Sequence, residues 1–174
     1  MLGQLINQKI STDDEVKSLL DKISDTAKES SESIRDIVWF INPSNDTSET
    51  LVTRIKDCAY KLLSGINYKF NMPENIFESV NDLKARRQIF FILKEAITNA
   101  AKHSHASIIE ITAEKNDKIL KFVIKDNGVG IDEINTTTGN GFINMKKRAE
   151  QIKAKLKIIQ IEKNAGTEVE LTLT

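Results

Sequence analysis

A long apolar seam near the start of the chain is the feature that most constrains its fold. Apolar or small residues recur there in steps of four and three, at Val16, Leu20, Ile23, Ala27, Ser30, Ile34, Ile37 and Ile41. Steps of this kind are typical of a helix in a coiled coil or helix bundle, where the seam faces a partner. We therefore predict one long bundle-forming helix at the start of the chain.

The ends of this helix are predicted from local signals. Thr12, Asp13 and Asp14 favour a helix start, because a capping side chain is followed by acids in the first turn. Asn42-Pro43 ends it, because proline disfavours helix in the preceding residue. A single helix cannot bury its own seam. The stretch Leu2–Ile10 could cover part of it, but we expect a second copy of the chain to cover most of it in a homodimer.

Composition excludes several classes of function. Lys plus Arg and Asp plus Glu both number 25, so the net charge of zero gives no support for nucleic-acid binding. No run approaches the roughly 18 apolar residues that span a bilayer, and no signal peptide opens the chain. The single cysteine, Cys58, reads as a small buried hydrophobe in a reducing compartment. We expect a cytoplasmic location, with any membrane segment in a parent sequence outside this chain.

The remaining pattern predicts alternating helices and strands. A second helix carries Leu51, Ile55, Cys58 and Leu62, with a capping box from Asp46 to Glu49 and an end at Gly65. Strands are expected at 66–70, 107–113, 119–125, 156–161 and 169–173, and further helices at 82–103 and up to about 153. Turns are expected at Asn116-Asp117 and at Asn164-Ala165-Gly166.

Helices segregated from a mostly antiparallel sheet predict an α+β fold, namely a two-layer α/β sandwich with the helices on one face. We divide the chain into a partial dimerisation segment (1–42), a linker helix (43–65) and a catalytic domain (66–174).

The helix at 82–103 has one polar face. Glu95, Asn99, Lys102 and His103 are spaced to share it, and the opposite face is apolar, with Ile89, Phe90, Leu93, Ala96, Ile97, Ala100 and Ala101. A carboxylate and an amide oxygen suit a hard cation, and a lysine suits phosphate. The same pattern is also typical of a helix face exposed to solvent, so it does not identify a site by itself.

The segment Asp126-Asn127-Gly128-Val129-Gly130 directly follows a predicted strand. An ionised aspartate accepts hydrogen bonds only, so Asp126 would suit an exocyclic amine such as that of adenine. Gly128 and Gly130 would let a ligand approach the backbone closely. The alternative is a plain turn, because Asp-Asn-Gly is common in turns.

The third segment is Gly139-Asn140-Gly141 at the expected start of a helix. Glycines there leave backbone N–H groups and the positive end of the helix dipole open to a phosphate. The polar run Thr136–Thr138 before it is typical of a movable lid. The signal is weak alone, because the lysine of a P-loop is missing.

Taken in order, the three segments are far more specific than any one of them. Leu93–His103 (LKEAITNAAKH) resembles the N box of the GHKL ATPase superfamily, with its Bergerat-type ATP-binding fold. DNGVG resembles the G1 box, and Gly139–Glu150 (GNGFINMKKRAE) resembles the G2 box. The details are similar to histidine kinases of the nitrate-sensor and lipid-fluidity-sensor type. Glu32–Leu51 (ESIRDIVWFINPSNDTSETL) also resembles the second dimerisation helix and linker of such kinases.

The resemblance implies ATP and Mg²⁺ as cofactors and a role for each matched residue. Asn99 would ligate Mg²⁺, and Lys102 with His103 would lie near the phosphates. Glu95 would polarise the attacking group or orient a water. Asp126 would accept from adenine, with Thr167 beside it, because Gly166-Thr167 before the last strand resembles the superfamily's last nucleotide-binding element. The glycines would admit the adenosine at Gly128 and Gly130, and would let the lid close at Gly139 and Gly141.

The implied activity is transfer of the γ-phosphoryl group of ATP to a histidine on the dimerisation helices, for relay to a response-regulator receiver domain. The only histidines, His103 and His105, lie in or just after the N-box match, so we expect no self-phosphorylation on the usual residue. Two alternatives stay open. One is another enzyme of the superfamily, such as an anti-sigma-type serine kinase or an ATPase; the other is a non-catalytic dimeric scaffold.

Overall fold

The computed structural model describes residues 2–42, 45, 47–130, 140–161 and 166–174. The chain forms two compact units, Met1–Pro43 and Ser44–Thr174. The finer division at residues 42 and 65 stays a prediction. Thr136–Thr138 and Asn164-Ala165, expected to form a lid and a turn, lie outside the described residues.

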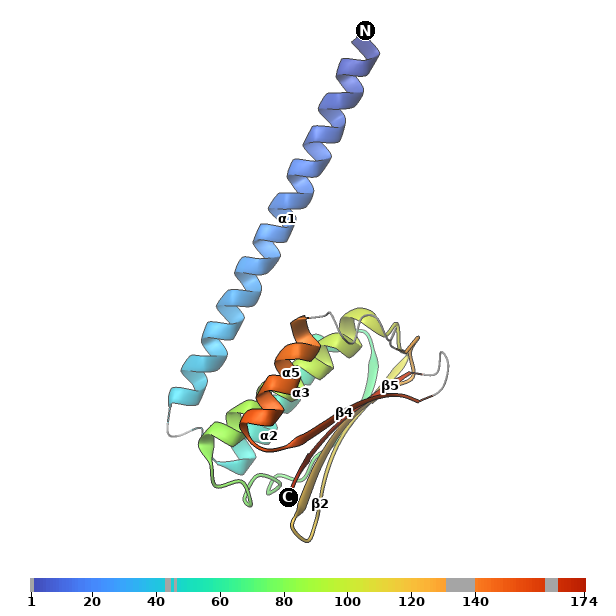
Figure 1. Cartoon of the computed structure of the whole chain (residues 1–174). Helices are drawn as coiled ribbons and strands as arrows, with labels where there is room; N and C mark the ends of the chain where they lie inside the picture. Colours follow the sequence, from blue (N-terminus) through green and yellow to red (C-terminus); the bar gives the residue numbers. More distant parts are fainter. Residues whose placement is uncertain (1, 43–44, 46, 131–139, 162–165) are drawn as a thin grey trace. The chain divides into compact units, whose positions relative to one another are not determined.

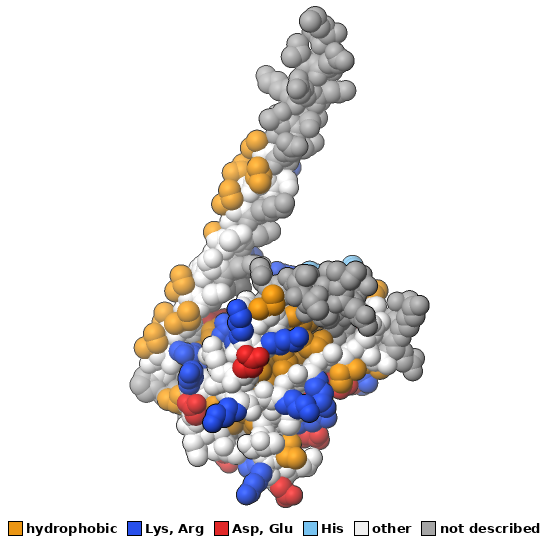
Figure 2. Space-filling model, in the orientation of Figure 1, with side chains coloured by type: hydrophobic (Ala, Val, Ile, Leu, Met, Phe, Trp, Pro, Cys, Tyr) orange, Lys and Arg blue, Asp and Glu red, His pale blue; other side chains and the backbone are white. Residues whose placement is uncertain are grey.

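The first unit is a single helix, α1 (Leu2–Ile41). It ends at Ile41 as Asn42-Pro43 predicts, but the predicted start at Thr12 is wrong, because the helix is continuous from Leu2. Leu2–Ile10 therefore extends the helix and does not fold back on it. The large apolar side chains of the seam from Val16 to Ile41 are 47–70% exposed, and Figure 2 shows orange side chains gathered along this helix. Within the described residues, no helix is both long and apolar enough to cross a membrane.

The second unit contains a five-stranded sheet in the order β1-β2-β3-β5-β4. The strands are β1 (Asn67–Asn71), β2 (Ile108–Asn116), β3 (Ile119–Asp126), β4 (Lys155–Gln160) and β5 (Thr167–Leu173). Strands β1 and β2 are parallel, and the other neighbouring pairs are antiparallel. The predicted hairpin is confirmed, with Asp117 at a positive φ of 51° in its turn.

Among the described residues, three helices cover one face of this sheet (Figure 1): α2 (Ser48–Leu62), α3 (Leu83–His103) and α5 (Asn140–Gln151). The predicted α+β fold, a two-layer sandwich with a mostly antiparallel sheet, is confirmed. The cap of α2 lies one residue later than predicted, because Thr47 accepts from the Thr50 N–H at 3.1 Å. Asp82 caps α3 by accepting from the Lys84 N–H at 2.9 Å.

The buried core follows from the two-residue period of the strands and the period of about 3.6 residues of the helices. Alternate residues of β3 are buried, at Leu120, Phe122 and Ile124, because successive side chains of a strand point to opposite faces. On α3 the buried stripe includes Ile89, Leu93 and Ile97, which recur every four residues and face the sheet. Phe122 stacks on Phe77 with ring centroids 5.3 Å apart.

The other face of the sheet is charged. Glu170 on β5 pairs with Lys121 of β3 at 2.8 Å and with Lys157 of β4 at 3.1 Å. These pairs lower the pKa of Glu170, through the hydrogen bond from Lys121 first, and raise that of Lys121. The helices α2, α3 and α5 lie on the opposite face of the sheet (Figure 1).

Replacing Phe122 by alanine tests the location of the core. We expect a loss of about 3–5 kcal/mol in the free energy of unfolding, because a fully buried ring leaves a cavity. Ile119→Ala on the same strand is the control; Ile119 is 47% exposed, and its loss should stay below about 1 kcal/mol. Urea unfolding measures both. Equal losses would contradict this assignment of the core.

Candidate functional site

The polar face of α3 is divided between two environments. Glu95 and Asn99 are half-buried, whereas Lys102 and His103 are exposed in the last turn of the helix. The opposite face is buried as predicted, except that Ala101 is only half-buried. Half-burial of a carboxylate and an amide beside each other is not what a plain solvent-facing stripe would show.

The start of α5 lies against these two side chains. A Cβ atom at Gly141 would overlap Oε1 of Glu95 and lie 3.6 Å from Nδ2 of Asn99. A side chain at position 141 would therefore require the carboxylate of Glu95 to move. Of the two glycines predicted at this helix start, Gly141 is brought to Glu95 and Asn99, and Gly139 lies outside the described residues.

Asp126 lies at the end of β3 on the core side of the sheet. It follows Leu120, Phe122 and Ile124 in the alternation, so its carboxylate is buried beneath the helical layer. The Gly128 N–H donates to Oδ1 of Asp126 at 2.9 Å, and the Thr167 N–H also donates to the carboxylate. Burial raises the pKa of Asp126, and these two donors partly oppose the rise.

The register between β3 and β5 places Thr167 beside Asp126. Lys125 pairs with Glu168 across β3 and β5, so the next position brings Asp126 opposite Thr167. Thr167 is itself buried. Gly166, at a φ of 101°, lets the turn before β5 reach Asp126, since a Cβ there would overlap the Asp126 carbonyl oxygen.

The loop after Asp126 is fixed to the end of α3. The Val129 N–H donates to the carbonyl of Ser104, the C-cap of α3, at 2.8 Å. A Cβ at Gly128 would overlap that same carbonyl. The helix that carries Glu95 and Asn99 is thus also the support for the Asp126 loop.

Hydrogen bonds of the Asn127 side chain also hold this loop in place. Its Oδ1 accepts from the N–H groups of Ser107 and Ile108 at 3.0 Å each, and its Nδ2 donates to Oγ of Ser107 at 2.9 Å. Ser104 and Asn127 are the residues that sequence reasoning missed. Asn127 was within the motif but read only as turn chemistry, and nothing near Ser104 in the sequence signals its contact with residue 129.

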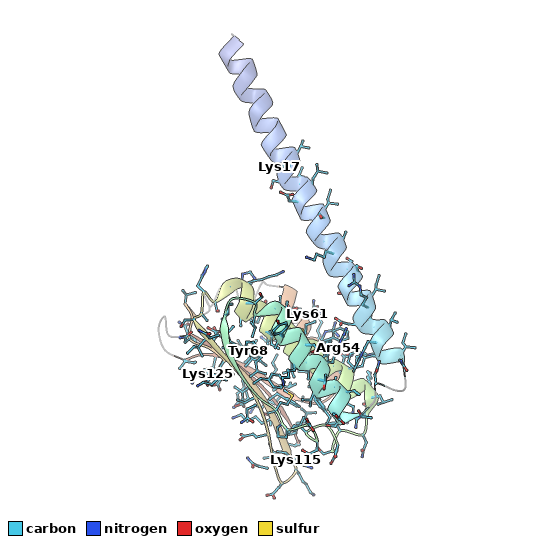
Figure 3. The ribbon with its side chains drawn as sticks, turned by 180° about the vertical axis from the view of Figure 1, so that it is seen from behind. Lys17, Arg54, Lys61, Tyr68, Lys115 and Lys125 are labelled. Carbon is cyan, nitrogen blue, oxygen red and sulfur yellow. The ribbon has the colours of Figure 1, made fainter. Side chains whose placement is uncertain are left out.

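The site lies at one end of the sheet. Figure 3 shows Lys125, the neighbour of Asp126, at the end of the sheet opposite Lys115 at the hairpin tip. Two predicted segments therefore contact α3: the start of α5 at Gly141 lies against Glu95 and Asn99, and the loop after Asp126 lies against Ser104. Gly130 faces a different element, with Nε2 of Gln160 on β4 at 3.0 Å from a Cβ built there.

Residues 84–174, just over half of the chain, match the family of histidine kinase-, DNA gyrase B- and HSP90-like ATPases. The chain belongs to this family. The match confirms the predicted ATPase domain of this superfamily. All the segments that meet at α3 lie within the matched residues.

Individual proteins with similar sequences include named sensor proteins. The nitrate/nitrite sensor protein NarX of Escherichia coli K12 is 39% identical over 83 residues, covering 47% of this chain and 14% of NarX. The sensor protein VraS of Staphylococcus aureus is 27% identical over 144 residues, covering 79% of this chain and 39% of VraS. The chain thus spans only a minor part of these curated relatives.

The fold comparison extends further along the chain. The histidine kinase AdeS of Acinetobacter baumannii superposes with a TM-score of 0.61 at 17% identity, covering 91% of this chain and 82% of that one. This likeness supports the fold, including a helix before the ATPase domain.

Alanine substitutions at Gly128 and Gly141 test whether each glycine lies against rigid backbone or against a movable side chain. Gly128→Ala should lower the free energy of unfolding by about 1–3 kcal/mol, because its Cβ meets the rigid backbone of Ser104. Gly141→Ala should change it by less than about 1 kcal/mol, because its Cβ meets the movable end of Glu95 and alanine favours helix. Thermal unfolding measures both. The reverse order would contradict the geometry.

Asp126→Asn tests the buried charge. Because the pKa of Asp126 is raised, the folded chain binds a proton on this carboxylate more tightly than the unfolded chain does. The free energy of unfolding therefore falls as pH rises from the pKa of Asp126 in the unfolded chain to its pKa in the folded chain. The free energy of unfolding of the variant relative to the parent should therefore increase from about pH 3 to pH 7, starting near the ordinary aspartate pKa of about 3.9. Asp57→Asn, on the exposed side of α2, is the control. A difference that does not change with pH would refute the effect of burial.

Proposed function

We propose that this chain is the ATP-binding catalytic part of a two-component sensor histidine kinase. The observation that carries the proposal is the convergence on α3: Gly141 lies against Glu95 and Asn99, and the Asp126 loop is fixed to the C-cap of the same helix. Residues separated by up to 46 positions (95 to 141) are needed for this arrangement. A plain surface helix and two unrelated turns would have no reason to meet.

Asp126 is suited to the adenine end of the nucleotide. Its two oxygens offer about four acceptor positions, and the Gly128 and Thr167 N–H groups are its two backbone donors. The remaining capacity can accept from the exocyclic amine of adenine, directly or through water. Gly128 and Gly130 would admit the adenosine, and Thr167 would lie beside it.

Asn99 and Glu95 are suited to the phosphate end. The described part of the chain holds no cluster of three or more His, Cys, Asp or Glu side chains able to hold a metal. Mg²⁺ needs no such cluster, because it is commonly bound by one or two protein oxygens together with substrate phosphates and waters. The amide oxygen of Asn99 fits that role. When bound, Mg²⁺ neutralises charge on the phosphates.

The other matched residues have supporting roles in the proposal. Lys102 and His103, exposed at the end of α3, would be near the phosphates. Glu95 would polarise the attacking imidazole or orient a water. Gly141, with Gly139, would let the segment before α5 close over the phosphates, where the N–H groups at the start of a helix favour an anion. Phosphoryl transfer demands mainly such positioning.

The acceptor and the partners also belong to the proposal. Residues 2–41 of α1 contain no histidine, so the acceptor would be supplied by a dimerisation helix that is not among them. A second copy of the chain would cover the exposed seam of α1, and a response-regulator receiver domain would take the phosphate. The proposed location is the cytoplasm, with the segments 1–42, 43–65 and 66–174 serving dimerisation, linkage and catalysis.

Asn99→Ala tests the nucleotide site. Calorimetric titration with a non-hydrolysable ATP analogue should show the parent chain binding more tightly with Mg²⁺ than without, and the variant should lose this difference. Asn71→Ala is the matched control, because Asn71 is exposed at the far end of β1. A parent chain that binds no nucleotide would refute the proposal, as would a variant with unchanged Mg²⁺ dependence.

The class of kinase needs a separate test. The chain is mixed with labelled ATP, Mg²⁺ and a histidine-bearing acceptor helix from a sensor kinase. Acid-labile label on that helix supports the proposal, and label on serine would favour the anti-sigma-type alternative. Binding without transfer to either would favour a non-catalytic scaffold. Acid-labile label on the chain alone would contradict the expectation that it does not phosphorylate itself.

A further inference from the structure

Arg148 lies on α5, two turns after Gly141, on the face that packs against α3. Its Nη1 donates to Oε1 of Gln88 at 2.8 Å, and its guanidinium carbon lies 4.6 Å from the ring centroid of Phe91. Gln88 is only 6% exposed. The hydrogen bond engages an N–H at the edge of the planar guanidinium, and the aromatic ring lies against the group. A guanidinium with both contacts is held in a fixed orientation.

These contacts fix how α5 lies on α3. At one end Gly141 meets Glu95 and Asn99, and at the other end Arg148 meets Gln88 and Phe91. The chain number rises along α5 as it falls along α3, so the two helices are antiparallel. The two contacts are seven residues apart on each helix, that is from 141 to 148 and from 95 to 88. This spacing is two helical turns, which keeps each set on one face.

Met145 of α5 lies between these two contacts and is tightly packed. Met145, one turn after Gly141 on the same face of α5, is fully buried. Because well-packed interiors do not deform continuously, α5 cannot slide on α3 without breaking one of the two end contacts. Arg148 is the polar, directional contact of the pair.

Glu95 connects Arg148 electrostatically to the start of α5. Burial lowers the pKa of Arg148, the charge of Glu95 opposes that shift, and Arg87 adds to it. The Glu95 carboxylate is therefore within electrostatic reach of the guanidinium while it also lies against the backbone of Gly141. A cation on one side and a helix start on the other restrain where this carboxylate can lie.

We propose that Arg148 is a positioning residue for phosphoryl transfer: it sets the register of α5 on α3 and so holds the start of α5 and the Glu95 carboxylate at the phosphate end of the site. The proposal rests on the function proposed above. It assigns to Arg148 no contact with the nucleotide. A simple packing role would instead stabilise the whole ATPase domain without favouring one end of the site.

Arg148→Met distinguishes these roles, because it keeps the length of the side chain and removes the guanidinium. Affinity for a non-hydrolysable ATP analogue with Mg²⁺ should fall about tenfold, and affinity for ADP by less than about threefold, since only the terminal phosphate depends on the start of α5. Transfer to the supplied acceptor helix should fall by about a hundredfold at saturating ATP, as expected for misplacement of about 1 Å. Lys147→Met, an exposed lysine on the same helix, is the matched control.

Hydrogen exchange gives a readout that needs no nucleotide. In the free protein, Arg148→Met should raise amide exchange in the first turns of α5, at Gly141–Met145, and leave exchange at the Asp126 loop unchanged. Arg148→Lys keeps the charge without the planar fork and should recover part of the transfer rate. It also replaces the methionine variant for all measurements if that variant does not fold.

The outcomes separate the two proposals. If the parent chain binds ATP and transfers phosphate, but the Arg148 variants lose affinity for ADP and for the ATP analogue by the same factor, the positioning role is overturned and the function stands. Unchanged binding, transfer and exchange would overturn it equally. If the parent chain binds no nucleotide, the function fails, and the role of Arg148 in phosphoryl transfer fails with it.

Discussion

Burial of one face of α3 on the sheet is the interaction on which the rest of the structure depends. Ile89, Leu93 and Ile97 are at most 1% exposed, and they pack against the same sheet face as Phe122. At about 25 cal/mol per Å² of apolar surface, each such side chain stabilises the fold by roughly 1.5–3 kcal/mol. This packing fixes the rotation of α3 about its axis. The helix therefore presents Glu95 and Asn99 on the side where α5 begins, at Gly141.

Two kinds of contact then attach the Asp126 loop and α5 to this helix. Gly128 lets the loop lie on the backbone of Ser104 at the end of α3, and Gly141 lets α5 begin against the side chains of Glu95 and Asn99. Ser104, Gln88 and Arg148 supply hydrogen bonds that are satisfied inside the protein. Close backbone contact sets distance, and buried hydrogen bonds set direction, since an unpaired buried donor costs about 1–3 kcal/mol. Together they position the Asp126 loop and the start of α5, the two parts of the proposed nucleotide site, with respect to one helix.

The sequence predicted what depends on local spacing. The period of α3, the alternation in β3 and the hairpin at Asp117 were all readable, because each depends on neighbours within one or two turns. The start of α1 was wrong by ten residues, because Thr12–Asp14 provide good capping chemistry that a continuous helix does not use. The cap of α2 moved from Asp46 to Thr47 for a similar reason, since both residues can accept from a nearby N–H.

The candidate site residues were predicted from motifs, and their geometry could not be predicted from the sequence. Glu95, Asn99, Asp126, Gly128, Gly141 and Thr167 were named from motifs, and the structure brings Gly141 to Glu95 and Thr167 to Asp126. The partners that orient them could not be read from spacing. The contact between Arg148 and Gln88 spans 60 positions, and both residues sit in patterns that equally suit an exposed polar face. Only the antiparallel packing of α3 and α5 makes them neighbours.

Asp126 shows why such a site conflicts with maximal stability. The alternation that places Leu120, Phe122 and Ile124 in the core also places this carboxylate beneath the helical layer, where its charged form is disfavoured. Asparagine could accept the Gly128 N–H without that charge. A protein selected for stability alone would have little reason to keep an acid there. Retaining one is understandable if the charge strengthens a hydrogen bond to a donor that is absent from the free chain, because hydrogen bonds to ionised acceptors are about twice as strong as neutral ones. In the proposed function, the exocyclic amine of adenine would be that donor.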